Sequence, residues 1–257
     1  MTLLFEKKDK IAYITFNRPD KYNSVNKETA MAFQVALDDC AKDKSIRCVV
    51  LSGNGKAFCA GQDLGEIVDP NGPPLDEIVS NHYNPIVLKI RALEKPVIAA
   101  VNGIAAGAGA NVALACDIVI AKESASFLQA FSKIGLIPDS GGTYTLPRKV
   151  GLARASALMM LGEKVPAKEA QQMGMIYKAV ADDEFDAVIE KTANKLANMP
   201  TVGLALTKKL LNESVKNNME EQLALEHECQ NIAGVTEDYG EGVKAFLEKR
   251  PAVFKGK

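Results

Sequence analysis

The stretch VIAAVNGIAAGAGANVALACDIVIA, residues 97–121, decides the fold class. Its first five residues, 97–101, are apolar and partly β-branched, which favours a short buried strand. A glycine-rich turn follows, and we expect a helix to begin at about Ala110. Residues 117–121, in which Asp117 precedes four apolar residues, are again typical of a strand. This alternation of strand, helix and strand predicts an α/β fold.

The same stretch has to be compared with a membrane helix. Residues 97–116 carry no charged side chain and are about long enough to cross a bilayer. Gly103 and Gly107 also have the spacing that packs transmembrane helices together. However, the run opens with β-branched residues after a proline, is broken by Asn102-Gly103 and contains Asn111. A buried strand, a turn and a buried helix fit better, so we expect no membrane association.

On either side, the pattern extends the same α/β core. Runs at 11–16 and 47–51 predict two more strands, and Asn26 is a suitable N-cap for a helix that ends near residue 41. Residues 65–85 contain several prolines and few periodic apolar positions. We therefore expect either a mobile lid or a plain surface loop there, followed by a helix at 85–93.

From residue 153 onward the pattern is nearly all helical. Three amphipathic segments close the chain, at 201–217, 220–233 and 238–250. The last two are too short to bury much surface alone, so they should pack on the core, on a neighbouring subunit, or on both. We divide the chain into a core, 1–200, and a C-terminal helical region, 201–257.

The overall composition excludes several classes of protein. Of the 257 residues, 47% are hydrophobic and 25% are charged, which is an ordinary globular mixture. The net charge is −1 and the cationic residues are scattered, so no nucleic-acid-binding stripe is present. Five cysteines without a C-x-x-C pair and only two histidines predict neither disulfides nor a metal site. Residues 1–10 lack the pattern of a signal peptide, so we expect a cytoplasmic protein.

Three turns have sequences in which the backbone could face a ligand: FCAGQDL at 58–64, NGIAAGAG at 102–109 and GLIPDSGGT at 135–143. In the second turn, glycines permit a close approach and a helix follows at once. The free N–H groups and the dipole of a helix start favour negative charge, so this turn suits an oxyanion. Many such turns only serve packing, and the spacing matches neither the dinucleotide nor the phosphate-loop glycine motif.

The third turn contains a lone carboxylate, Asp139, between Ile137-Pro138 and a pair of glycines. Apolar neighbours raise the pKa of a carboxyl group, which suits it to take up and return a proton. The structural alternative is that Asp139 only caps the helix that follows.

The tetrapeptide DSGG at 139–142 also occurs around the nucleophile of trypsin-like proteases. That assignment would make Ser140 the nucleophile and His82 its base. Those proteases are all-β, secreted and disulfide-linked, whereas this chain is α/β without a secretion signal. Pro138 also stands where they have a glycine, so we do not favour this assignment.

Taken together, these segments resemble the crotonase superfamily, the enoyl-CoA hydratase and isomerase group, over essentially the whole chain. The resemblance rests on FNRP at 16–19, AFCAGQDL at 57–64, PVIAAVNG at 96–103, CDIV at 116–119 and EGVKAFLEKR at 241–250. It implies a crotonase-like spiral of ββα units with a C-terminal helical trimerisation region, the trimer often being doubled to a hexamer. It also implies an acyl-CoA thioester substrate, in which coenzyme A is part of the substrate and no separate cofactor is needed.

The resemblance further implies the site residues. Gln62 and Ala108 match the positions whose backbone N–H groups form the family's oxyanion hole, and Asp139 matches the acid/base of several isomerases. The coenzyme A part is expected near residues of the first turn and of the C-terminal region, the latter from this or a neighbouring subunit: Arg18, Lys21, Ala60, Gln62, Asp63, Leu64, Phe246 and Lys249. For Arg18, Lys21, Phe246 and Lys249, an ordinary surface or packing role is the alternative.

Two positions depart from the family's hydratases, which carry two glutamates that bind and activate water. The matching residues here are Asn111 and Phe131, and neither can act as a general base. In contrast, HYNP at 82–85 and IPDSGGTY at 137–144 are similar to isomerases that convert ring-1,2-epoxyphenylacetyl-CoA to its oxepin and shift 3-enoyl to 2-enoyl double bonds. We therefore expect an acyl-CoA isomerase. The alternatives are an enoyl-CoA hydratase that works without the two glutamates, and a crotonase-fold binding protein without catalysis, such as an RNA-binding one.

Overall fold

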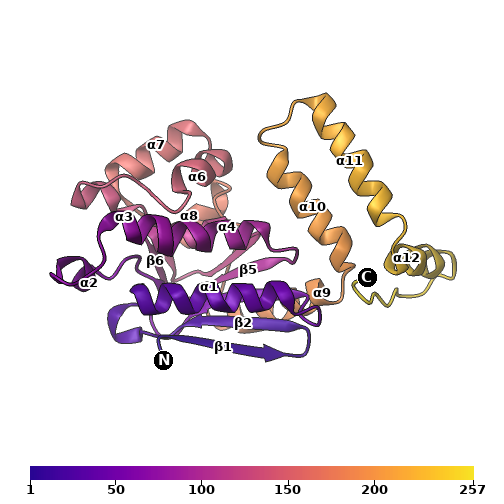
Figure 1. Ribbon diagram of the computed structural model, residues 1–257, viewed down its shortest axis with the longest axis horizontal. Coiled ribbons are helices and arrows are strands. Elements are labelled where there is room, and N and C mark those ends of the chain that lie inside the picture. The colour runs from indigo at the N-terminus through magenta and orange to yellow at the C-terminus, as the bar shows by residue number, and fades with distance from the viewer.

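The computed structural model describes residues 1–257 and contains two β-sheets (Figure 1). The first sheet has the strand order β1 (Leu3–Lys8), β2 (Ile11–Phe16), β3 (Cys48–Gly53), β5 (Val97–Val101), β7 (Ile118–Lys122) and β10 (Lys178–Val180). The second has the order β4 (Ala57–Cys59), β6 (Ile104–Ala106), β8 (Ser126–Leu128) and β9 (Lys164–Pro166). From β3 to β8 the chain alternates between the two sheets, which confirms the predicted α/β spiral.

Most strand pairs are parallel. Only β1 with β2, and β8 with β9, run antiparallel. Parallel strands are covered on both faces, so they consist of continuous apolar runs rather than alternating ones. β5 follows this rule, because all five of its residues are buried. The apolar run at 97–101 is therefore a central strand, between β3 and β7.

Helices cover the two sheets and extend the chain at its C-terminal end. The helices of the core are α1 (Lys27–Lys42), α2 (Leu64–Val68), α3 (Leu75–Glu77), the π-helix η2 (Ile78–Tyr83), α4 (Asn84–Ala92), α5 (Ala108–Ala115), α6 (Gly142–Val150), α7 (Leu152–Leu161), α8 (Ala167–Gln172) and α9 (Phe185–Ala197). Two 3₁₀ turns accompany them, η1 (Pro19–Lys21) and η3 (Ala130–Ile134). The last three helices are α10 (Thr201–Glu213), α11 (Met219–Ala233) and α12 (Glu237–Leu247).

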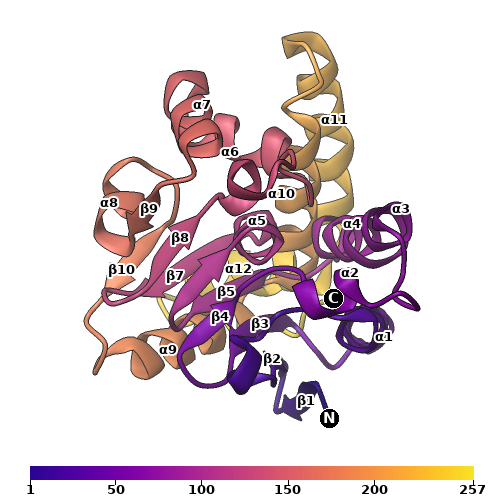
Figure 2. The ribbon, with the colours of Figure 1, turned by 90° about the vertical axis from the view of Figure 1, so that its left-hand side faces the viewer.

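Helix α5 lies inside the molecule, between the sheets and the outer helices (Figure 2). All eight of its residues are buried, and all but Asn111 are apolar or glycine, as expected for a helix inside a protein. None of the helices combines the length and the apolarity needed to cross a membrane.

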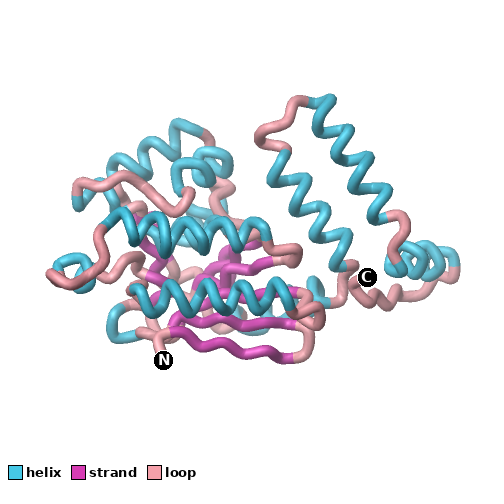
Figure 3. Tube along the Cα trace, in the orientation of Figure 1, coloured by secondary structure: helices cyan, strands magenta, loops and turns pink.

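Several element predictions are confirmed and some are wrong. Asn26 caps α1 as expected, because its side chain accepts a hydrogen bond from the Thr29 N–H. Helix α5 begins at Ala108 instead of Ala110. The predicted loop at 65–85 is largely helical, since α2, α3 and η2 occupy most of it (Figure 3). The region after residue 153 is nearly all helical, as expected, and only the three-residue strands β9 and β10 interrupt the helices.

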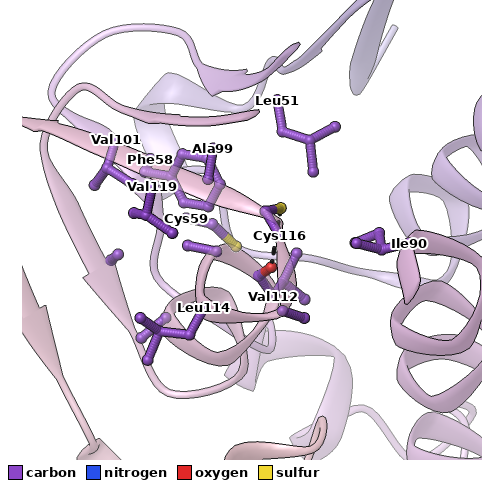
Figure 4. Close-up of a cluster of buried hydrophobic side chains, with 14 of the residues drawn as sticks. Leu51, Phe58, Cys59, Ile90, Ala99, Val101, Val112, Leu114, Cys116 and Val119 are labelled. Carbon is purple, nitrogen blue, oxygen red and sulfur yellow. Dashed lines mark hydrogen bonds between the residues drawn. The ribbon is translucent and has the colours of Figure 1, made fainter. Parts of the chain in front are cut away.

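The larger hydrophobic core lies around α5 and the inner faces of both sheets. Figure 4 shows part of it, where strand residues from both sheets surround Cys116 and Leu114. All five cysteines are free thiols and all are buried. The Cys116 thiol donates a hydrogen bond to the Val112 carbonyl (3.4 Å), one turn earlier in the chain. These cysteines therefore act as small core residues.

The C-terminal helices stand beside the core rather than on it (Figure 1). Two buried cations attach them. Lys208 of α10 lies 2.8 Å from the Asp117 carboxylate and donates to the Ile90 carbonyl. Arg47 donates to the Thr201 hydroxyl (2.8 Å) and to the Phe254 carbonyl (2.9 Å). Long-range hydrogen bonds thus hold a region that shares little core with the rest.

We expect Arg47→Ala to lower the free energy of unfolding by about 2 to 4 kcal/mol, because several buried acceptors lose their donor. Urea unfolding measures this, and limited proteolysis should show earlier cleavage within residues 200–257. Arg154→Ala, at an exposed arginine without a hydrogen-bond partner, is the matched control and should be neutral. An Arg47→Ala protein as stable as the control would contradict this account of the attachment.

Candidate active site

A cavity of about 200 Å³ lies where the three turns singled out in the sequence come together. Its walls include residues from each turn: Ala60, Gly61, Gln62, Gly107, Ala108 and Asp139. The structure therefore brings Gln62, Ala108 and Asp139, the three predicted catalytic residues, to one cavity.

The Gln62 N–H is available because its turn pairs with the chain near Val25. The Val25 N–H donates to the Gly61 carbonyl (2.7 Å), and the Asp63 N–H donates to the Val25 carbonyl (2.9 Å). In a trans peptide group the C=O and the following N–H point in opposite directions. Since the Gly61 carbonyl points toward Val25, the Gln62 N–H points away from it.

The Ala108 N–H is free for a different reason. Ala108 is the first residue of α5, so its N–H has no partner within the helix. The peptide before it is turned by Gly107, whose φ of 53° and ψ of −129° favour glycine. A Cβ on Gly61 would lie 3.4 Å from the Ala108 nitrogen. Glycine at 61, with φ of +90°, keeps the space in front of this N–H open.

Gly109 brings the two turns into direct contact. A Cβ at this position would lie 2.3 Å from the Cys59 carbonyl oxygen and 2.7 Å from its sulfur. Only a residue without a side chain permits this approach. The relative position of the two N–H groups therefore depends on a backbone contact with no side chain between them.

Asp139 is the one acidic residue in the cavity wall. Burial raises the pKa of its carboxyl group above the ordinary value of 3.8, and a hydrogen bond from the Ser140 hydroxyl (2.9 Å) opposes part of this shift. A carboxylate with a raised pKa accepts a proton more readily than an exposed one, which suits Asp139 to proton transfer.

Asn111 holds the backbone of the Asp139 turn. Its side-chain amide donates to the Asp139 carbonyl (2.8 Å) and accepts from the Gln129 amide (2.8 Å). Asn111 is 1% exposed, and a Cβ on Gly142 would lie 2.3 Å from its amide nitrogen. The Asn111 amide therefore fits closely between α5 and the turn. Its hydrogen bond to the Asp139 carbonyl positions that turn.

The remaining walls of the cavity are mostly apolar. Phe131, the second residue that departs from the hydratase pattern, is 6% exposed and lies in the wall. The others come mainly from the helical segment after the first turn and from the loop before Asp139: Leu64, Ile67, Leu75, Ile78, Ile134 and Leu136. Such a wall suits the hydrocarbon part of an acyl group.

The structure disfavours both alternatives for the third turn. Helix α6 has Gly141 at its N-cap and no side-chain cap, so Asp139 does not cap it. The Ser140 hydroxyl donates to Asp139, while neither ring nitrogen of His82 has a hydrogen-bond partner. A nucleophilic serine with a histidine base is therefore not assembled.

The predicted coenzyme A residues divide into two groups. Arg18 and Asp63 form an ion pair (2.7 Å) directly beside Gln62, and Lys21 is exposed nearby. Phe246 and Lys249 belong to α12 and the residues after it. Figure 1 shows α2 and α12 at opposite ends of the molecule, so one chain does not bring these two residues to the cavity.

The sequence analysis missed Tyr83 and Gln129. Gln129 is buried behind Asn111, and Tyr83 lies in the cavity wall with 1% exposure. Tyr83 falls in the segment that was expected to be a loop. It belongs to the HYNP motif at 82–85, but no role was assigned to it, because its place in the cavity depends on tertiary packing.

We expect Gly109→Ala to lower the free energy of unfolding by at least about 2 kcal/mol, because the new methyl group overlaps the Cys59 backbone. Urea unfolding measures the change. The matched control is Gly240→Ala in α12, where a Cβ meets nothing within 4 Å and should stabilise the helix slightly. Equal stability of the two variants would contradict the close contact.

Comparisons with known proteins agree with this geometry. The sequence matches the family Enoyl-CoA hydratase/isomerase over residues 6–257. It is 48% identical to the 1,2-epoxyphenylacetyl-CoA isomerase of Escherichia coli (strain K12), over 95% of this chain and 94% of the other. It is 44% identical to a Rhodobacter capsulatus protein named "Probable enoyl-CoA hydratase", over 100% and 98% of the two chains.

Solved structures show the same likeness in three dimensions. The enoyl-CoA hydratase from Bacillus anthracis superposes with a TM-score of 0.93 at 32% identity, over 100% of both chains. Sequence, fold and the three turns around the cavity thus lead to one conclusion: this chain is an enzyme of the enoyl-CoA hydratase/isomerase (crotonase) family, which acts on acyl-CoA thioesters.

Proposed function

We propose that this chain is an acyl-CoA isomerase that stabilises a thioester enolate with two backbone N–H groups and moves a proton with Asp139. The observation that carries the proposal is the composition of the cavity. It combines the residues of two free N–H donors, a single carboxylate and apolar walls.

The proposed mechanism follows from these groups. The thioester carbonyl oxygen accepts hydrogen bonds from the N–H groups of Gln62 and Ala108. Asp139 removes a proton from the α-carbon of a 3-enoyl thioester, and the negative charge moves to the carbonyl oxygen. The protonated Asp139 exchanges its proton with solvent and then delivers a proton to the γ-carbon, which gives the 2-enoyl product. Each donor of this kind typically contributes a factor of about 100 to 1,000 in rate.

Isomerisation fits these residues better than hydration. Adding water requires a base that holds and deprotonates the water molecule, and family hydratases use two glutamates for this. The Asn111 amide donates a hydrogen bond to the Asp139 carbonyl, and Phe131 contributes only an aromatic ring to the cavity wall. Neither side chain can deprotonate water. A proton shuttle needs only the one carboxylate.

The identity of 48% with an epoxyphenylacetyl-CoA isomerase supports a finer proposal. We infer that the substrates are ring-1,2-epoxyphenylacetyl-CoA, which is converted to oxepin-CoA, and 3-enoyl-CoA thioesters. In the epoxide reaction Asp139 assists ring opening while the same two N–H groups hold the thioester.

The coenzyme A part would lie along the first turn, at Arg18, Lys21 and residues 60–64. Phe246 and Lys249 complete this site only if they come from another subunit. The C-terminal helices expose several large apolar side chains, with Phe246 83% and Leu247 74% exposed. We therefore propose that residues 201–257 assemble the chain into a trimer, or into a hexamer made of two trimers, through this surface.

The central test is Asp139→Asn with 3-hexenoyl-CoA in heavy water. The wild-type protein should produce 2-hexenoyl-CoA that contains deuterium, and the variant should lose about 100- to 10,000-fold in kcat/KM. Asp183→Asn, at an exposed acid, is the matched control. Crotonyl-CoA hydration that is faster than isomerisation would instead favour a hydratase. Inactivity in both assays with salt-sensitive RNA binding would favour a binding protein.

The pH dependence tests the protonation state. Asp139 has to be ionised to remove a proton, and burial raises its pKa. Activity should therefore fall as the pH decreases through a value above 3.8, the ordinary value of an aspartate. The pH profile of kcat/KM measures this limit. A limit at or below 3.8 would contradict the role of a buried Asp139.

The assembly is tested by light scattering. We expect a particle of three or six times 27.6 kDa. Phe246→Asp should reduce the mass and raise KM for acyl-CoA, whereas Val35→Asp, at an exposed apolar residue of α1, should change neither. A monomeric wild-type protein, or an unchanged KM in a dissociated variant, would contradict the shared site.

A further inference from the structure

Tyr83 has a hydroxyl group that the proposed mechanism does not use. The residue ends the π-helix η2, and its side chain is 1% exposed. It lies in the wall of the same cavity as Asp139, and its hydroxyl oxygen is buried without a hydrogen-bond partner. π-helical turns are rare and occur frequently at functional sites.

An unpaired buried hydroxyl is unfavourable. Leaving such a group without a partner costs about 1 to 3 kcal/mol, and buried tyrosine hydroxyls usually find one. Burial and the nearby acidic groups, including Asp139, hold the pKa of Tyr83 well above its ordinary value. The side chain is therefore a neutral phenol, and it can donate a hydrogen bond to a ligand.

Besides Tyr83, the wall of the cavity contains the polar groups of Gln62, Lys133 and Asp139 and the N–H of Ala108. The N–H groups of Gln62 and Ala108 bind the thioester oxygen. The Asp139 carboxylate moves the proton and accepts a hydrogen bond from Ser140. No hydrogen bond joins Tyr83 to Asp139, since the Tyr83 hydroxyl has no partner. The Gln62 side-chain oxygen is also unpaired but does not accept from Tyr83, so an acceptor atom of the acyl group can serve as the partner of this donor.

We propose that the Tyr83 hydroxyl donates a hydrogen bond to an oxygen atom on the acyl group, and that the enzyme therefore prefers acyl groups that carry such an oxygen over plain hydrocarbon ones. This inference rests on the proposed function and specifies its substrate class. A plain hydrocarbon acyl group leaves the Tyr83 hydroxyl unpaired, whereas an acyl group with an epoxide or hydroxyl oxygen gives it an acceptor.

Calorimetric binding to the assembled protein tests the proposal without relying on turnover. The ligands are phenylacetyl-CoA and its 2-, 3- and 4-hydroxy derivatives, which differ by one oxygen at different ring positions. We expect at least one hydroxy derivative to bind wild type about tenfold more tightly than phenylacetyl-CoA. In Tyr83→Phe this preference should fall to nearly one. Tyr177→Phe, at a 70% exposed tyrosine, should retain it.

Two results would overturn the inference. One is a wild-type protein that binds no hydroxy derivative more tightly than phenylacetyl-CoA, a measurement that needs no variant. The other is a preference that persists in Tyr83→Phe. The Asp139→Asn assay reports separately on the proposed function. If Asp139→Asn loses isomerisation and either of these results is also found, the proposed isomerase function is supported and only the role of Tyr83 is contradicted.

Discussion

The contact between two backbone turns, made possible by glycines, is the constraint on which the site depends. Gly109 allows α5 to start against the Cys59 carbonyl, and Gly61 keeps the front of the Ala108 N–H clear. The N–H groups of Gln62 and Ala108 belong to the main chain. Their direction therefore depends on the path that the chain takes as it alternates between the two sheets. The buried helix α5 and its supporting strands hold that winding in place. Preorganised donors of this kind need little reorganisation when charge develops on a substrate oxygen.

In the proposed mechanism, the preference for isomerisation over hydration also depends on residues behind the cavity wall. The same α5 that supplies the Ala108 N–H also carries Asn111, whose amide holds the turn with Asp139. Family hydratases are expected to have a glutamate at this position, whereas Asn111 donates a hydrogen bond to the backbone of the residue that we propose as the acid/base. Asn111 thus replaces one of the two water-binding glutamates of the hydratases, and it also holds the turn that carries Asp139.

Much of the fold and of the candidate site could be predicted from the sequence, because the decisive parts are local. The apolar run of β5, the Asn26 cap and the glycine turns each act over a few residues. The first strand β1 and all five three-residue strands, β4, β6, β8, β9 and β10, were missed. Tertiary pairing rather than local propensity defines such short strands. The segment 65–85 was judged a loop from its prolines, although packing makes most of it helical. The positions of Tyr83 and Gln129 in the site could not be predicted, although Tyr83 belongs to the HYNP motif, because both depend on contacts between distant segments.

The buried thiols have a consequence for how the protein responds to oxidation. Burial raises the pKa of Cys48, Cys59 and Cys116 to about 12 each and that of Cys40 to about 11. At neutral pH the reactive thiolate is then about ten-thousandfold or more rarer than the thiol, and solvent reagents hardly reach it. These sulfurs should react mainly in molecules that have transiently opened. Their rate of alkylation would thus report how often the folded chain opens.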